Sequence, residues 1–247
     1  YIDINSNNKF YYDDVGNLGS VYTSAVHNNK LYLGTNQGLF FKNISSLDGF
    51  KKIDAVEGQV WNLKLIDNTL FCAHNLGVFE VNDTQVKPIY TKTGAWKFLK
   101  YGTNEILVGT YNGIHLLKRT GDSWQYSNKL KGFNISSRFV ELTSDTTMLV
   151  SHGYKGVFKL TFDNALKSIQ ESIQLLSEKS PSSLSSLQGD TYYFNANGFY
   201  KYNQPNNSFE LDPLVSSLTE NDMFTSRKMV AVSNDQLFLF GKKYMYK

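Results

Sequence analysis

The sequence predicts an all-β protein made of repeated four-stranded antiparallel units, and two observations support this prediction. A phrase of about ten residues recurs along the chain, at 31–41, 70–79, 106–115, 148–158, 191–200 and 237–246. The copies that keep a second glycine place it 36 to 43 residues apart, which is the period of a four-stranded blade. Because one such unit cannot bury its own apolar faces, the copies must stack around an axis. The predicted architecture is therefore a β-propeller.

The second copy illustrates how each unit divides into strands. Asp67 and Asn68 form an Asx pair suited to a tight turn with positive φ, and Gly77 supplies backbone freedom at the next turn. The apolar residues between these turns are nearly continuous, as expected of a strand with both faces buried. The four strands predicted from this pattern are 60–66, 70–73, 78–82 and 86–91.

The same order of strands fits the other copies. Equivalent first turns are predicted at 27–30, 101–104, 144–147, 188–190 and 233–236, so six blades are visible. A seven-bladed ring and an incomplete ring both stay open as alternatives. The stretch 164–180 has apolar residues at both helical and alternating spacing, and its position in the repeat favours an outer strand.

The two ends of the chain have strand character and predict a closed ring. Residues 1–4 and 9–13 resemble the third and fourth strands of a blade, and residues 229–240 resemble the first two. Pairing the N- and C-terminal strands would complete the last blade and cover exposed strand edges. We therefore expect a single β-propeller domain over residues 1–247, and its abrupt ends indicate a segment excised from a longer protein.

Composition argues against several classes of function. The 247 residues carry a formal net charge of +3, and no basic run alternates with exposed aromatic residues, so no direct nucleic-acid contact is expected. No apolar stretch approaches the roughly 18 residues of a membrane span, so no membrane insertion by this segment is expected. The single cysteine, Cys72, lies among apolar residues of a predicted strand and is interpreted as a buried core residue.

The repeated phrase resembles the two-component-regulator propeller repeat, whose core reads roughly Leu-Trp-Ile-Gly-Thr-x-x-Gly-Leu-x-x-Tyr. Residues 31–40 and 106–114 match it best, whereas Ala73 and Ser151 replace the first glycine of their copies. The resemblance covers essentially the whole chain. In that family the propeller is the sensor part of Bacteroidetes hybrid histidine kinases or of helix-turn-helix regulators, and usually has seven blades.

The resemblance implies a non-catalytic sensor domain in the periplasm of a bacterium. The expected partners are a small carbohydrate or metabolite ligand, a downstream output domain of the same chain and a second copy in a homodimer. The output domain would be a kinase or a transcription-regulating helix-turn-helix. A protein-interaction scaffold and a glycan-active propeller enzyme remain as alternatives.

Candidate ligand-binding residues follow from putting the repeats in register. In an antiparallel blade, the start of the first strand lies on the same rim as the turn between the second and third strands. Aromatic planes and polar donors on one rim suit a sugar or another polar metabolite. The starts of first strands contribute Tyr22, Trp61, Trp96, Arg138 and Arg227. The turns contribute His74, Asn75, Tyr111, Asn112, His152 and Tyr154. For the tryptophans, wedging between blades is the competing interpretation, and for the arginines it is a rim salt bridge.

No catalytic residue, cofactor or metal site is predicted. The four histidines are His27, His74, His115 and His152, and no pair has metal-ligand spacing with an acid or thiol nearby. Nucleophile elbows and phosphate-binding glycine loops are not found in the sequence.

Overall fold

The computed structural model describes residues 16–177, 182–195, 197–219, 229–233, 236–240 and 243–247. The chain divides into two compact units, one of residues up to 75 with 79–87 and one of residues 76–78 with 88 onward. The predicted pairing of the two ends falls on residues 1–4 and 9–13, which lie outside the described residues.

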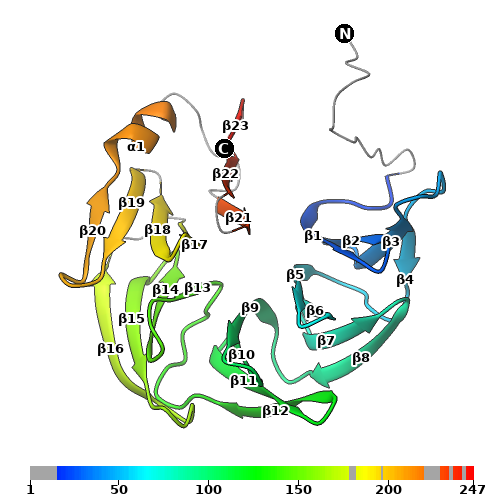
Figure 1. Ribbon diagram of the computed structural model, residues 1–247, viewed down its shortest axis with the longest axis horizontal. Helices are drawn as coiled ribbons and strands as arrows, with labels where there is room; N and C mark the ends of the chain where they lie inside the picture. The colour runs from blue at the N-terminus through cyan, green and yellow to red at the C-terminus, as the bar shows by residue number, and fades with distance from the viewer. Residues whose placement is uncertain (1–15, 178–181, 196, 220–228, 234–235, 241–242) are drawn as a thin grey trace. The chain divides into compact units, whose positions relative to one another are not determined.

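Four-stranded antiparallel sheets account for most of the described chain, as the repeat predicts (Figure 1). The first sheet holds β1 (Val21–His27), β2 (Lys30–Thr35), β3 (Leu39–Asn43) and β4 (Lys51–Ile53). The second holds β5 (Val60–Ile66), β6 (Thr69–His74), β7 (Gly77–Asn82) and β8 (Gln85–Tyr90). The third holds β9 (Ala95–Tyr101), β10 (Glu105–Thr110), β11 (Gly113–Thr120) and β12 (Ser123–Lys129).

Two further four-stranded sheets and a smaller one follow. The fourth holds β13 (Phe139–Leu142), β14 (Thr147–His152), β15 (Gly156–Phe162) and β16 (Ile169–Leu176). The fifth holds β17 (Ser183–Leu187), β18 (Asp190–Asn195), β19 (Gly198–Asn203) and β20 (Ser208–Leu211). The described residues of the last sheet form β21 (Met229–Ser233), β22 (Gln236–Phe240) and the short β23 (Met245–Tyr246). The strand predicted within 164–180 is confirmed as β16.

Turn chemistry places the strands as the sequence predicts. The Asx pairs Asn28-Asn29 and Asp67-Asn68 adopt positive φ at all four residues, and they join β1 to β2 and β5 to β6. Gly113 has a φ of 123°, and a Cβ atom there would lie 2.4 Å from the carbonyl oxygen of Phe133. The second glycine of the phrase therefore allows the connection that follows the outer strand to pass close to the turn.

Each unit has apolar cores of its own between successive sheets. In the first unit, Tyr32, Leu39, Val60, Leu63 and Cys72 belong to one buried cluster, which confirms the core position of Cys72. In the second unit, one cluster of described residues runs from β9–β11 to β13–β16. Sheets that are hydrophobic on both faces can bury them only against neighbouring sheets, which is why these cores form between copies of the repeat.

A polar network links the first strands of three successive sheets in the second unit. The Lys97 ammonium on β9 forms a salt bridge with the carboxylate of Glu141 on β13. The other carboxylate oxygen of Glu141 accepts a hydrogen bond of 3.2 Å from the Ser186 hydroxyl on β17. Glu141 is buried, and these two partners satisfy its carboxylate.

One element was not predicted. The repeat pattern contains no helix, but the helix α1 (Pro213–Thr219) follows β20. Asp212 caps this helix, since its carboxylate accepts a hydrogen bond of 2.9 Å from the backbone N–H of Val215. Proline suits the first helical position because its missing N–H would be unpaired there in any case.

Candidate functional site

The topology of each sheet defines two ends, which are named here sheet by sheet. We call the end that holds the starts of the first strands and the turns between second and third strands the upper rim. The opposite end, with the turns between first and second and between third and fourth strands, is the lower rim. The predicted ligand-binding residues that the structure describes lie at upper-rim positions of their sheets.

A repeated hydrogen bond fixes the upper rim of three sheets. The backbone N–H groups of Asn36, Asn75 and Tyr111 donate to the carbonyls of Ser20, Gln59 and Gly94, at 3.0–3.1 Å. In the first two sheets the asparagine side chain adds a second bond. Asn36 Oδ1 accepts from Ser20 N at 2.7 Å, and Asn75 Oδ1 accepts from Gln59 N at 3.1 Å. Asn75, a predicted site residue, therefore ties its turn to the start of β5.

In the third sheet a tyrosine takes the place of this asparagine. The ring of Tyr111 packs on Trp96, with ring centroids 4.6 Å apart and planes inclined by 37°. The Arg138 guanidinium lies 5.1 Å from the Trp96 ring centroid and 5.3 Å from that of Phe139. Trp96 Nε1 donates a hydrogen bond of 2.9 Å to the Ser136 hydroxyl. We call Trp96, Tyr111, Ser136 and Arg138 the Trp96 cluster.

The Trp96 cluster combines features that suit a polar ligand. The rings of Trp96 and Tyr111 are half-buried, and Arg138 is exposed. A guanidinium above an aromatic face is held by a cation–π contact. The hydrogen bond to Ser136 fixes the indole in one orientation. The structure thus brings together three of the predicted site residues, two of them from strand starts and one from a turn.

The other predicted site residues that the structure describes make contacts of their own within each unit. In the first unit, Tyr22 stacks on Trp61 with ring centroids 5.0 Å apart. In the second unit, His152 Nδ1 accepts a hydrogen bond of 3.1 Å from the backbone N–H of Tyr154, whose side chain is exposed. Arg227 lies outside the described residues.

The histidines are mostly core residues. His74 is only 1% exposed, and its ring packs edge-on against Phe79 at 5.5 Å. Burial lowers the pKa of His74 and of His152, because the charged form is poorly solvated there. Burial, helped by the Lys129 charge, lowers the pKa of His115 to about 4. Among the described residues no group of three histidine, cysteine or acidic side chains could hold a metal ion.

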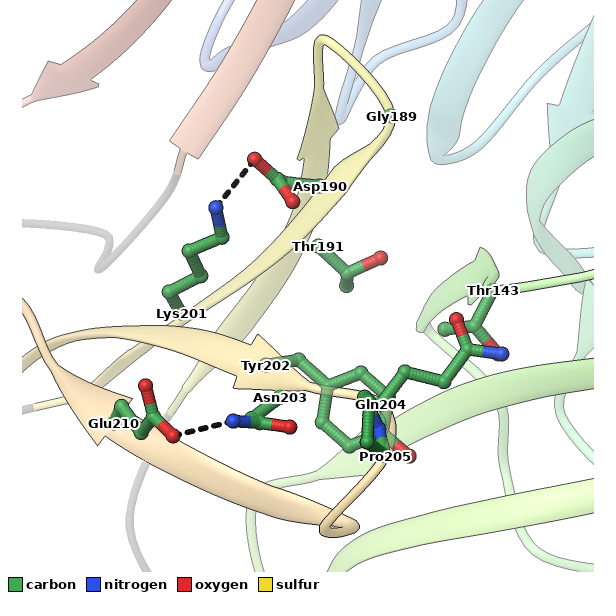
Figure 2. A pocket seen from close by; sticks show the side chains of 10 residues that line it. All are labelled: Thr143, Gly189, Asp190, Thr191, Lys201, Tyr202, Asn203, Gln204, Pro205 and Glu210. Carbon is green, nitrogen blue, oxygen red and sulfur yellow. Dashed lines mark hydrogen bonds and ion pairs between the residues drawn. The ribbon is translucent and has the colours of Figure 1, made fainter.

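A polar cleft that sequence reasoning missed lies on the lower rim of the β17–β20 sheet (Figure 2). It has a volume of about 470 Å³. It is lined by Thr143, Gly189, Asp190, Thr191, Lys201, Tyr202, Asn203, Gln204, Pro205 and Glu210. The sequence marks Gly189 and Asp190 only as an ordinary turn, and nothing in the repeat pattern shows that the strands separate beside them.

Comparison with known proteins identifies the fold. No protein-family profile matches the sequence, and no characterised protein matches it at a significant level. Among solved structures, the chain is similar to the extracellular domain of the hybrid two-component system BT4673 of B. thetaiotaomicron. The TM-score is 0.65 at 14% identity, over 97% of this chain and 33% of that one.

Two other solved structures show how widely this fold is used. The extracellular domain described as the one-component system BT4673 of B. thetaiotaomicron gives a TM-score of 0.62 at 17% identity, over 90% of this chain and 31% of that one. Virginiamycin B lyase from Staphylococcus aureus gives 0.63 at 10% identity, over 92% and 79%. The chain spans about a third of the regulator domains that it resembles.

No helix among the described residues is long and apolar enough to cross a membrane. The antiparallel four-stranded sheets and these similarities together confirm the predicted architecture. The chain has a β-propeller fold, and the extracellular domains of Bacteroides regulators are among the structures that share it.

Proposed function

We propose that this chain is a non-catalytic sensor domain of a bacterial signal-transduction protein. In this proposal it lies in the periplasm, binds a small carbohydrate or metabolite on its upper rim and passes a rearrangement to an output domain of the same protein. The fold that it shares with regulator extracellular domains supports the proposal. So does the repeated phrase, which resembles the propeller repeat of two-component regulators.

The observation that carries the proposal is the Trp96 cluster. Two aromatic faces and an exposed guanidinium meet in this cluster. Tyr111 stands at the repeat position where the first two sheets carry a structural asparagine. Aromatic faces stack on the apolar C–H faces of sugar rings, and guanidinium donors orient hydroxyl or carboxylate oxygens. The third sheet keeps the backbone hydrogen bond of this turn without the asparagine. The turn therefore does not depend on the side chains of the Trp96 cluster.

The composition of the cluster favours binding over turnover. Its members supply rings, a guanidinium and a hydroxyl that already accepts the indole N–H. General acid and base catalysis of glycan cleavage would require a suitably placed carboxylate pair or a base of matched pKa. The Trp96 cluster contains no such pair.

The test is a screen of neutral and acidic oligosaccharide mixtures by thermal shift, with product analysis by chromatography. We expect a saturable rise in melting temperature without consumption of the sugar. Trp96→Ala should weaken binding at least tenfold, because the stacking platform is lost. Tyr126→Ala is the matched control, since Tyr126 also stacks on a tyrosine, Tyr90, but on outer strands. Turnover, or equal loss in both variants, would contradict the proposal.

A second candidate is a protein-interaction scaffold, favoured by exposed apolar side chains in two upper-rim turns. Leu76 is 57% exposed and Tyr154 is 76% exposed. Contiguous exposed apolar surface marks protein-interaction sites, so the scaffold function requires these two side chains to belong to one patch. Light scattering together with the oligosaccharide screen distinguishes the two functions: a dimer that Leu76→Ser with Tyr154→Ser abolishes, in a protein that binds none of the sugars, supports the scaffold.

A further inference from the structure

The ladder between β18 and β19 ends before the strands do. Its register pairs run from Asn195↔Gly198 to Tyr192↔Lys201 and stop there. In the β9–β12 sheet the equivalent ladder continues to Glu105↔Lys118, the first residue of β10. The backbones of Asp190 and Thr191 on β18, and of Tyr202 and Asn203 on β19, therefore stay outside the ladder between these two strands.

The polar cleft occupies the place where the two strands separate. Asp190 and Thr191 line one side and Tyr202 and Asn203 line the other, as Figure 2 shows. Thr191 is only 4% exposed, so the cleft extends to a buried hydroxyl. A volume of about 470 Å³ lies within the range of small-molecule sites.

Three charged side chains stand in a row at one mouth of the cleft. Lys201 is the register partner of both Tyr192 and Glu210, and Asp190 lies two residues before Tyr192. Alternate residues of a strand share a face, so Asp190, Lys201 and Glu210 lie on the same face of the sheet. Their order across the strands is carboxylate, ammonium, carboxylate.

The contacts of this row leave an excess of negative charge. Lys201 Nζ forms a salt bridge of 2.6 Å with Asp190 across the gap between the strands. Glu210 accepts a hydrogen bond of 2.5 Å from the neutral amide of Asn203. The hydrogen bond with Asp190 raises the pKa of Lys201, as expected for an ammonium beside carboxylates. One lysine thus faces two carboxylates.

We propose that this cleft binds a small organic amine, whose ammonium group pairs with Asp190 and Glu210 and whose chain enters between β18 and β19. Hydroxyl and amide groups of Thr143, Thr191 and Gln204 then bond the polar groups of the ligand. The resident ammonium of Lys201 competes for the same carboxylates. This site lies on the lower rim and shares no residue with the Trp96 cluster, so it stands apart from the proposed function.

The experiment compares putrescine with 1,4-butanediol, which has the same carbon chain with neutral hydroxyl groups. We expect saturable calorimetric binding of putrescine and at least tenfold weaker binding of the diol. Because the protein carries a formal net charge of +3, non-specific uptake of a dication is disfavoured. Equal affinity for both compounds, or no binding of putrescine, would overturn the proposal.

Variants assign the binding to the cleft. Asp190→Asn with Glu210→Gln should weaken putrescine binding at least tenfold. The matched control is Glu105→Gln, which removes a lower-rim carboxylate that pairs with Lys118 at 3.6 Å beside a complete ladder. It should bind as the unaltered protein does. Lys201→Met removes the competing ammonium and should tighten binding several-fold. A loss of binding in Lys201→Met, or an equal loss in Glu105→Gln, would refute the assignment.

Discussion

The β9–β12 and β17–β20 sheets are two copies of one repeat in the same unit, and they differ in what fills the space beside the turn between their second and third strands. At the penultimate residue of its second strand, the β9–β12 sheet has Gly109, where a Cβ atom would lie 2.2 Å from the carbonyl oxygen of Ser137. The β17–β20 sheet has Phe194 at the equivalent position, where it is buried in a cluster with Phe199 and Leu239. One sheet lets a neighbouring backbone approach closely, and the other fills the space with a ring.

What both sheets keep is the hydrogen bond inside the turn. Thr110 Oγ1 accepts from the backbone N–H of Asn112 at 3.3 Å. Asn195 Oδ1 accepts from the backbone N–H of Asn197 at 2.8 Å, from the same place in its repeat. The comparison teaches that the polar geometry of the turn persists when the packing around it changes.

The largest expected effect tests the second glycine of the two phrases. Gly113→Ala should lower the free energy of unfolding by about 4 kcal/mol, because strained φ and a fixed backbone oxygen act together. Gly198→Ala should cost about 2 kcal/mol, since its Cβ would meet the Leu211 Cδ1 atom at 2.8 Å, the movable end of a side chain. Denaturant unfolding of both variants measures the difference. Equal costs would contradict this account of the two turns.

The next effect tests the imidazole that only one of the two sheets carries. His115 is 2% exposed, and its counterpart two residues after Gly198 is Tyr200. The folded pKa of His115, about 4, lies below its ordinary value of 6.5, so the folded state favours the neutral ring. The stabilisation is fully present above pH 6.5 and is lost as the pH falls towards 4.

In His115→Phe, the free energy of unfolding should therefore fall less between pH 6.5 and pH 4 than in the unaltered protein, by roughly 3 kcal/mol. Unfolding free energies at several pH values check this, and the difference between the two proteins cancels the contributions of His74 and His152. Tyr200→Phe is the control and should leave the slope unchanged. Parallel curves for His115→Phe and the unaltered protein would refute the prediction.

The smallest effect tests whether the two turn bonds are equivalent. Asn195→Ala should cost about 1 kcal/mol, the usual contribution of one hydrogen bond. Asn195→Thr should restore most of that loss, because threonine makes the same bond at Thr110. Thermal unfolding of the two variants compares them. A threonine variant as unstable as the alanine variant would show that the positions differ.

The sequence predicts most of the fold because the repeat carries it. The positive-φ turns at Asn28-Asn29 and Asp67-Asn68 follow from residue type alone. The helix α1 was missed because seven residues are too few to show a period. The early end of the β18–β19 ladder leaves no local signal, since it depends on how two strands diverge in space.

The candidate site was predictable only in part. Topology places Trp96, Tyr111 and Arg138 on one rim, and the structure brings them into contact. The same register argument includes His74, which is a core residue packed on Phe79. Register determines the rim to which a residue belongs, but exposure depends on the side chains that surround it.

The carboxylate of Glu141 binds both Lys97 and Ser186, and these contacts limit how the number of repeats can change. Removing the copy that contains Glu141 would place an unmatched lysine against a serine, and duplicating it would bury an acid with no cation. Units that look interchangeable in sequence are therefore tied to their neighbours by charge. Gain or loss of a copy requires compensating substitutions on both sides.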